Sequence, residues 1–265
     1  MHPSEFRLGR LFDPVSRRAF IVAFDRGLGA SVTGGGENAD AVVTAIASSG
    51  ADGILLSPGM LDRQRHQLAH RNAPAVLLRA DLFLSGPLQP LGLAGEQCEE
   101  YRTLVSAAQA QAMGADAIVL FLILGFDNDA TTANNAQAVA RMSRKAHAIG
   151  LPVIVETVLW GSRSQDQSDA SALTYACRLA AELGADAVKT QYTGTPESMR
   201  ELVATCPVPV LLLGGPKSDT QDALMAQSAA ALSAGARGLV FGRNVWQSGD
   251  PAAATSRLRQ LVHAS

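Results

Sequence analysis

One three-residue phrase recurs along the chain of 265 residues and constrains its fold more than any other feature. Gly-Ala-Asp occurs at 50–52, 114–116 and 184–186, and the variant Gly-Ala-Arg occurs at 235–237. Each copy follows a segment of helical period and precedes a short apolar run. Glycine permits the left-handed residue that ends a helix, and the next residues lead into a strand. The phrase therefore indicates repeated turns from helix to strand.

Short apolar runs alternate with alanine-rich segments of helical period, which is typical of a parallel sheet with crossover helices. The predicted strands are Ala19 to Phe24, Gly53 to Leu56, Ala75 to Leu78, Ala117 to Leu122, Pro152 to Val155, Ala187 to Thr190, Val208 to Leu213 and Gly238 to Phe241. The predicted helices lie near 39–49, 61–70, 95–113, 131–149, 169–183, 195–204, 219–234 and 250–263. Eight strand–helix pairs predict an α/β fold, a (β/α)8 TIM barrel.

We expect one barrel domain over residues 1–265, with 1–18 as an N-terminal extension, because no linker rich in Pro, Gly or Ser divides the chain. The alternative is an open doubly wound sheet. Its usual GxGxxG turn would follow the first strand, where the chain instead reads DRGLG at 25–29, which is a poor match.

Composition argues against several classes of protein. The net charge of −2 and the pI of about 6.2 offer no basic surface for nucleic acid or an anionic membrane. The three cysteines lack CxxC spacing, which argues against a disulfide framework or a zinc site. The N-terminus has no apolar signal core, and no apolar run reaches 18 residues. We therefore expect a cytoplasmic protein.

Polar and charged residues gather where the predicted strands end, which is the catalytic end of such a barrel. The residues in question are Asp25 and Arg26 after strand 1, Arg79 after strand 3, Glu156 from strand 5, Lys189 from strand 6, Gly214, Gly215 and Lys217 after strand 7, and Gly242 and Arg243 after strand 8. Asp127 and Asp129, after strand 4, are either further members of this group or helix caps, because Asp is a strong N-cap residue. Arg26, Arg79 and Arg243 are each candidates to contact a second anionic group of a substrate.

Lys189 stands out because the chain has three lysines and nineteen arginines. Arginine fills nearly every position that needs only a solvated positive charge, so each lysine requires its own explanation. It ends a run that reads as a buried strand. Burial lowers the pKa of a lysine, and a neutral amine can attack a carbonyl at neutral pH. Lys145 lies among basic residues on a predicted helix surface, where solvation is sufficient explanation.

Strands 7 and 8 indicate a phosphate site. Both end in glycine, whose bare backbone N–H groups can approach an anion, and the loops after these strands commonly bind phosphate in barrels. Lys217 and Arg243 follow as cations, and the guanidinium suits phosphate oxygens. A buried amine beside a phosphate site predicts a lysine iminium on a phosphorylated carbonyl compound, with no cofactor. We expect no metal, since His66 and His70 lack the glutamate of an HExxH motif.

The motifs VAFDRG, GADAVKTQYTG, LLLGGPK and FGRNVWQ resemble those of a class I aldolase family over essentially the whole chain. That DeoC/LacD-like family groups archaeal-type fructose-bisphosphate aldolases, 2-amino-3,7-dideoxy-heptulosonate synthases and the autoinducer-2-processing thiolase LsrF. The resemblance implies a Schiff base on Lys189, proton transfer by Asp25, and phosphate binding by Gly214, Gly215, Gly242 and Arg243. It also implies carbohydrate metabolism and a homo-oligomer.

Two departures from the family pattern matter. The usual DHG motif reads Asp25-Arg26-Gly27 here, and the acid/base tyrosine expected after the strand 5 glutamate is absent from ETVLW at 156–160. Glu156 and Tyr192 are the candidates to carry the proton. We expect an aldolase that cleaves or forms a C–C bond in a phosphorylated ketose through a dihydroxyacetone phosphate-like iminium. The alternatives are a thiolase or heptulosonate-synthase-like transferase using the same lysine, and a non-catalytic phosphosugar-binding relative.

Overall fold

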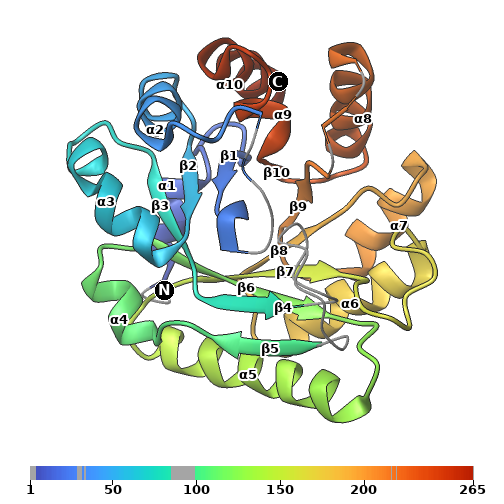
Figure 1. Cartoon of the computed structure of the whole chain (residues 1–265). Coiled ribbons are helices and arrows are strands. Elements are labelled where there is room, and N and C mark those ends of the chain that lie inside the picture. Colours follow the sequence, from blue (N-terminus) through green and yellow to red (C-terminus); the bar gives the residue numbers. More distant parts are fainter. Residues whose placement is uncertain are drawn as a thin grey trace.

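The computed structural model describes residues 4–28, 32, 34–84, 99–215, 217–218 and 220–264, and its centre is a closed barrel of parallel strands ringed by helices (Figure 1). In order around the barrel, the strands are β1 (Ala19–Phe24), β10 (Gly238–Phe241), β9 (Val210–Leu213), β8 (Ala187–Thr190), β7 (Val153–Val158), β6 (Ala117–Ile123), β3 (Ala75–Arg79) and β2 (Gly53–Leu56). The predicted (β/α)8 barrel is confirmed, and each predicted strand has a counterpart.

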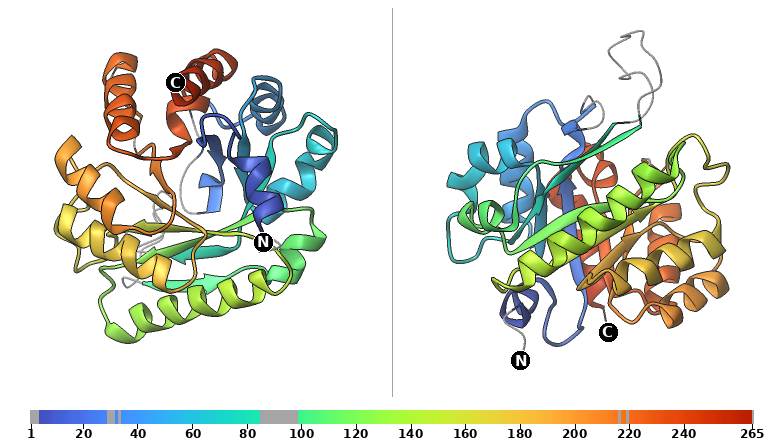
Figure 2. Two further views of the ribbon diagram at one scale, coloured as in Figure 1. Left: turned by 180° about the vertical axis from the view of Figure 1, so that it is seen from behind. Right: turned by 90° about the horizontal axis from the view of Figure 1, so that it is seen from below.

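Helices follow the strands and cover the outside of the barrel (Figures 1 and 2). They are α2 (Ala39–Ser48), α3 (Pro58–Leu68), α4 (Ala107–Ala112), α5 (Asp129–His147), α6 (Ala170–Glu182), α7 (Pro196–Thr205), α8 (Gln221–Ser233) and α10 (Pro251–His263). Two short elements follow barrel strands directly, the 3-10 helix η1 (Arg26–Leu28) after β1 and α9 (Arg243–Trp246) after β10. None of the described helices combines the length and the apolar character needed to cross a membrane.

The helix predicted over 95–113 is wrong in its first half. Glu100–Thr103 is a strand, β5, which pairs antiparallel with β4 (Asp81–Leu84), and residues 95–98 lie outside the described residues. The helix α4 begins only after Ser106, whose side chain accepts from the backbone N–H of Gln109 while the Gln109 side chain returns to the cap. This capping box fixes the helix start, and the residues before it are free to pair as a strand.

The Gly-Ala-Asp phrases have a structural role at the end of the barrel where the strands begin. The carboxylates of Asp52, Asp116 and Asp186 accept the backbone N–H groups of Phe20, Val76 and Val153, at 2.6, 2.9 and 2.8 Å respectively. Each of these donors lies at the start of a barrel strand. The aspartates therefore satisfy donors that burial would otherwise leave unpaired.

The segment 1–18, expected as an N-terminal extension, contains helix α1 (Glu5–Leu11), which lies at this same end (Figure 2). Leu11 joins the side chains that fill the barrel, and Arg10 Nη1 lies 2.5 Å from Asp116 Oδ1. The helix thus covers the bottom of the barrel, opposite the predicted catalytic end.

Alternation along the strands decides which side chains point into the barrel. The lower interior is filled by Leu11, Ala19, Ile21, Ala23, Leu55, Ala75, Leu77, Ala117, Val119, Ile154, Ala187, Leu211 and Val240. Two residues further along their strands come Arg79, Phe121, Glu156 and Lys189. Because side chains on the same face recur every second residue, these four lie in the next interior layer. The register pairs Glu156 with both Phe121 and Lys189.

Candidate active site

A cavity of about 680 Å³ lies above this layer, at the carboxyl ends of the strands. Of the residues predicted from the sequence, those that line it are Asp25, Arg26, Arg79, Glu156, Lys189, Gly214, Gly215, Gly242 and Arg243. Lys217 is exposed and is not among the lining residues. It lies four residues beyond the end of β9, whereas Arg243 lies two beyond the end of β10.

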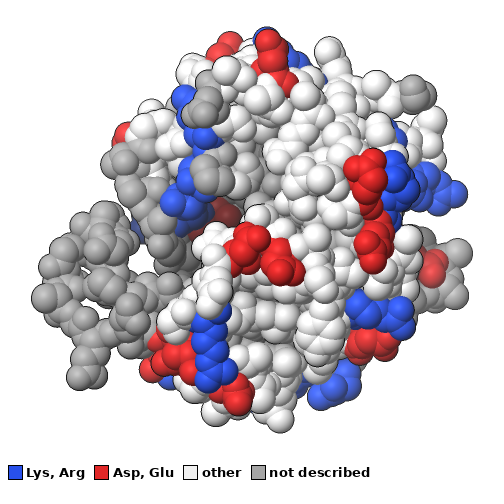
Figure 3. Space-filling model, turned by 90° about the vertical axis from the view of Figure 1, so that its right-hand side faces the viewer, with Lys and Arg blue, Asp and Glu red and all other residues white. Residues whose placement is uncertain are grey.

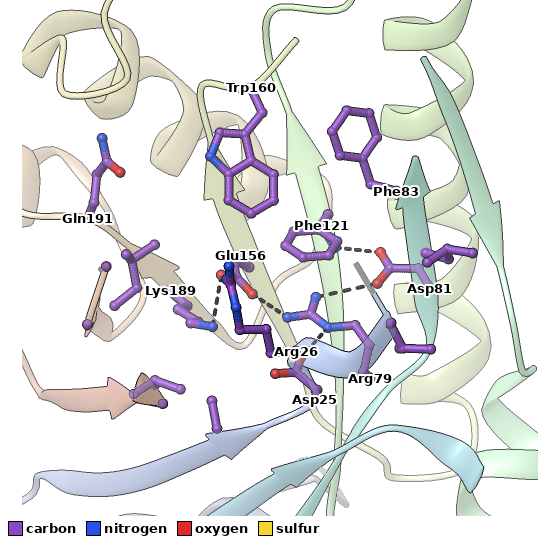
Figure 4. A pocket seen from close by; sticks show the side chains of 18 of the residues that line it. Asp25, Arg26, Arg79, Asp81, Phe83, Phe121, Glu156, Trp160, Lys189 and Gln191 are labelled. Atoms are coloured by element: carbon purple, nitrogen blue, oxygen red, sulfur yellow. Dashed lines mark hydrogen bonds and ion pairs between the residues drawn. The ribbon is translucent and has the colours of Figure 1, made fainter. Parts of the chain in front are cut away.

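Lys189 is buried in the cavity floor, with only 6% of its surface exposed. Its Nζ atom lies 2.8 Å from Oε1 of Glu156, the residue beside it on the neighbouring strand (Figure 4). The burial expected for Lys189 is present, and the amine has a single close carboxylate as its ion-pair partner among the described contacts. Glu156 Oε1 is therefore the nearest acceptor for a proton of this amine.

Arg79 is the centre of a larger ion-pair network that the sequence did not reveal. Its guanidinium, 2% exposed, donates to Asp25 Oδ2 at 2.8 Å, to Asp81 Oδ1 at 3.4 Å and to Glu156 Oε2. The guanidinium carbon also lies 3.9 Å above the centre of the Phe121 ring. Figure 4 shows the resulting chain from Lys189 through Glu156 and Arg79 to the two aspartates. Arg79 was a candidate contact for a substrate anion, but each of its three nitrogens already pairs with one of these carboxylates.

The network sets the protonation of its members. Burial opposes the charge of Arg79, but Glu156, Asp25 and Asp81 outweigh it and raise the pKa of the guanidinium. Burial likewise acts to raise the pKa of Glu156, but Lys189 and then Arg79 hold it below its usual value. Burial dominates at Asp81, whose pKa is raised to about 6 even though Arg79 and the Phe121 N–H oppose the shift. Glu156 is thus an ionised carboxylate at neutral pH.

Arg26 and Arg243 line the cavity near the ends of β1 and β10. Burial, followed by the positive charge of Arg26, lowers the pKa of Arg243. An anion bound near both guanidinium groups would relieve this repulsion. Asn244 connects the neighbouring loops, since its Nδ2 donates to the carbonyl oxygen of Gly214 and its Oδ1 accepts from the N–H of Ser218, both at 2.8 Å.

Aromatic side chains form the opposite wall of the cavity. Phe83 from β4, Phe121 from β6 and Trp160 after β7 are all half-buried and line it (Figure 4). Their rings contact one another, with centroids 6.2 Å apart for Phe83 and Trp160 and 5.4 Å for Phe121 and Trp160. Trp160 therefore shapes the cavity. Nothing in the sequence pattern identified Phe83 or Phe121.

No tyrosine lines the cavity. The chain has three, all within the described residues. Tyr175 is exposed on α6, Tyr101 is buried, and Tyr192 packs against the hydrophobic core. Burial raises the pKa of Tyr192, and the charge of Glu197 adds to the shift. Of the two candidates for the missing acid/base, only Glu156 lies at the amine.

The remaining candidates lie elsewhere. His66 and His70 are exposed, and His66 Nδ1 lies 3.1 Å from the Arg63 carbonyl oxygen. Within the described ranges, no three His, Cys, Asp or Glu side chains form a group that could hold a metal ion. Asp127 and Asp129 are exposed near the start of α5, whose N-cap is Asn128.

On the face in Figure 3, charged side chains form small clusters among large uncharged areas.

Comparison with known proteins agrees with this geometry. A model of the DeoC/LacD family aldolases matches residues 19–248. The chain is 32% identical to an uncharacterized aldolase of Saccharolobus solfataricus, covering 98% of this chain and 94% of that protein. It is 30% identical to the 2-amino-4,5-dihydroxy-6-oxo-7-(phosphonooxy)heptanoate synthase of Streptomyces griseus, with coverages of 98% and 90%. A solved Schiff base-forming fructose-1,6-bisphosphate aldolase is 27% identical, with a TM-score of 0.81 and coverages of 98% and 100%. The chain therefore belongs to the DeoC/LacD family of aldolases.

Proposed function

We propose that this enzyme is a class I aldolase that forms or cleaves a C–C bond in a phosphorylated ketose, with Lys189 as the nucleophile. The observation that carries the proposal is the placement of Lys189, buried in the cavity floor and 2.8 Å from Glu156. The other two lysines, Lys145 and Lys217, are both exposed. Lys189 is thus the one lysine of the whole chain that a ketone in the cavity could reach.

Glu156 is placed to manage the proton of the amine. The ammonium must lose a proton before the nitrogen can attack a ketone carbon, and Glu156 Oε1 is the nearest acceptor. The attack gives a carbinolamine, and protonation of its hydroxyl releases water and leaves an iminium. The same carboxylic acid can return its proton to that hydroxyl. Arg79 holds the second oxygen of Glu156 throughout, so the carboxylate keeps its orientation.

Acid/base work in this site falls to carboxylates because no tyrosine lines the cavity. Asp25 is the second candidate, since it lines the cavity and its Oδ2 is fixed at 2.8 Å from Arg79 Nε. The iminium must lose a proton from the neighbouring carbon to become an enamine. We assign Asp25 to that step, and its pairing with Arg79 holds it in place.

The phosphate of the ketone would occupy the wall formed by Arg26 and Arg243 with the backbone of Gly214, Gly215 and Gly242. The paired guanidinium groups support this assignment because their mutual repulsion is relieved by an anion. The relatives also support it, since the Streptomyces griseus synthase and the solved aldolase both carry phosphorylated compounds in their names. Lys217 is exposed and does not line the cavity, so it could contact the phosphate only if its side chain moved toward the cavity.

Borohydride trapping tests the proposal. Incubation with dihydroxyacetone phosphate and borohydride should add the mass of the ketone less one oxygen atom, and only to the peptide that contains Lys189. The variant Lys189→Met should show no adduct. Lys145→Met removes an exposed lysine by the same substitution and should trap normally. An adduct that persists in Lys189→Met would contradict the proposal.

The transferase alternative uses the same lysine and needs a separate readout. A thiolase would release a free acyl-CoA only when coenzyme A is supplied with a phosphorylated diketone. Retro-aldol cleavage of a ketose phosphate that proceeds at the same rate without coenzyme A selects the aldolase. A chain that only binds phosphosugars would give neither product.

A further inference from the structure

The cavity has two chemically different halves, and the barrel fixes where they lie. In the closed order of eight strands, β10 lies opposite β6 and β9 lies opposite β3. The glycine loops and Arg243 follow β9 and β10, whereas Phe121 is on β6 and Phe83 follows β3. Lys189 on β8 lies between the two halves. The anion-binding wall and the aromatic wall therefore face one another across the nucleophile.

The aromatic half exposes apolar surface to the cavity. Phe83, Phe121 and Trp160 are all half-buried. A fourth aromatic residue, Phe126, is buried behind them, and its ring packs edge-on against that of Phe83 with the ring centroids 5.2 Å apart. Leu82, which precedes Phe83 on β4, also lines the cavity and is half-buried. Leaving such side chains in contact with water costs free energy, about 25 cal/mol for each Å² of apolar surface. A ligand with an apolar body would recover that energy.

Arg79 is the one lysine or arginine that lines this half, and it is already paired with carboxylates. All lysines and arginines of the chain fall within the described residues, and those that line the cavity are Arg26, Arg79, Lys189 and Arg243. Arg26 and Arg243 form the anion wall, and Lys189 is the nucleophile. Each of the three nitrogens of Arg79 pairs with a carboxylate. The side chain of Glu99 also lines the cavity and contributes a negative charge, held by the backbone N–H groups of Asp127 and Ser162. A second phosphate has no cation to meet it here.

We propose that the aromatic wall of Phe83, Phe121 and Trp160 binds the carbonyl partner, and that this partner is an unphosphorylated aldehyde with an apolar, preferably aromatic, body. This inference rests on the proposed function. The ketone phosphate lies on Lys189 with its phosphate toward Arg26 and Arg243, so its reactive carbon faces the other half of the cavity. The partner that reaches this carbon must occupy the space along the aromatic wall.

The reaction balances without any further reactant. The electron pair of the enamine forms the new C–C bond to the aldehyde carbon, and the aldehyde oxygen takes up the proton that the carbon next to the iminium released earlier. Nitrogen is then again an iminium. One water hydrolyses it, which regenerates Lys189 and releases a ketol phosphate. The water consumed equals the water released when the iminium first formed.

The test compares acceptors at a fixed concentration of dihydroxyacetone phosphate. Initial rates of ketol phosphate formation, followed by mass spectrometry, give kcat/KM for benzaldehyde, 3-methylbutanal and glyceraldehyde 3-phosphate. We expect both apolar aldehydes to exceed glyceraldehyde 3-phosphate by about tenfold or more, which is the discrimination that an apolar pocket provides. The variant Trp160→Ala should lose about tenfold for benzaldehyde. Tyr175→Ala, which removes an exposed aromatic side chain from α6, is the matched control and should lose nothing.

A binding measurement separates the aromatic wall from catalysis. Both tryptophans of the chain line the cavity, but Trp160 is half-buried on the aromatic wall, whereas Trp246 follows β10 on the opposite side and is only 2% exposed. Trp246 also donates its Nε1–H to the Ala23 carbonyl oxygen. Titration with benzyl alcohol, which cannot form an iminium, should change the fluorescence of the wild-type protein and not that of Trp160→Phe.

The outcomes distinguish the two proposals. Failure of dihydroxyacetone phosphate to trap on Lys189 refutes the proposed function and this inference with it. Normal trapping together with a preference for glyceraldehyde 3-phosphate overturns this inference alone. Normal trapping with a fluorescence response that survives in Trp160→Phe places the apolar ligand elsewhere and also overturns it. Trapping of Trp160→Ala by dihydroxyacetone phosphate serves as the check that this variant is folded.

Discussion

Replacement of Arg79 by methionine should destabilise the protein in a way that depends on pH. The guanidinium is almost completely buried and pairs with Asp25, Asp81 and Glu156. Methionine fills similar space but leaves these carboxylates with Lys189 as the one remaining cation of the network. Removing one partner from a buried ion pair costs about 3–5 kcal/mol, because the other charge stays buried and unpaired. We expect a loss of this size in the free energy of unfolding at pH 7.

The pH dependence follows from the sign of the pKa shifts. The pKa of Asp81 is raised from 3.8 to about 6 in the folded protein, so its ionised form already costs about 3 kcal/mol at pH 7. That cost is fully present above pH 6 and disappears as the pH falls toward 4. Without Arg79 the folded-state pKa of Asp81 and of Glu156 rises further, so the variant takes up protons at a higher pH. Its deficit should therefore shrink between pH 7 and pH 5.

Urea denaturation followed by circular dichroism at pH 5, 6, 7 and 8 measures both effects. Arg178→Met is the matched control, because Arg178 forms an exposed pair with Glu182 one helical turn away. Exposed pairs contribute about 0–1 kcal/mol, so this control should change little at any pH. A deficit in Arg79→Met that equals that of the control, or that stays constant from pH 5 to pH 8, would refute the reasoning.

Two further predictions concern the anion wall and the barrel itself. In steady-state assays, Arg243→Gln should raise KM for dihydroxyacetone phosphate about tenfold or more, since a charged hydrogen bond contributes about 1.5–3 kcal/mol. The same variant should leave KM for dihydroxyacetone, which has no phosphate, nearly unchanged. An equal rise for both ketones would contradict a phosphate contact. Gly238→Ala should lower the free energy of unfolding by about 3 kcal/mol or more, because Gly238 has φ 153° and a Cβ would lie 2.0 Å from the Ala19 carbonyl oxygen. Its control is Gly9→Ala in α1, where no atom lies within 4 Å of the added Cβ and a gain of roughly 0.5–1 kcal/mol is expected. Comparable losses in the two variants would show that the contact with Ala19 has no effect.

The barrel could be predicted because its signals are local. Each apolar run of four to six residues followed by a helical segment specifies one strand–helix unit, and the runs at 19–24, 53–56, 187–190 and 238–241 have the observed bounds. The hairpin of β4 and β5 was missed because its strands are separated by residues 85–99 and form one pair outside the barrel. Nothing local in Glu100–Thr103 indicates that partner.

Several residues of the candidate site were predicted one by one from the strand ends, but the aromatic wall and the contacts between the charged side chains were not. Lys189 and Glu156 follow from strand ends, but their contact depends on the register of β7 and β8. Arg79 meets Asp25, 54 residues away, and Glu156, 77 residues away. Such pairing depends on closure of the barrel, which places β1, β3 and β7 around one interior. A sequence shows that an arginine ends a strand, but the barrel decides whether its charge faces a substrate or three carboxylates.

The network explains how, under the proposed function, carboxylates can replace a tyrosine. In the free enzyme the positive nitrogen of Lys189 faces the negative Glu156, and in the iminium the nitrogen is positive again at the same place. The nitrogen is neutral in the free amine, the carbinolamine and the enamine, and at each of these stages the proton that was lost is held by a carboxylate. One positive and one negative charge therefore vanish together, and the net charge of the buried site stays constant. Because Arg79 keeps its charge and its contacts at every stage, no step requires an isolated buried charge, which would be the most costly state in such a site.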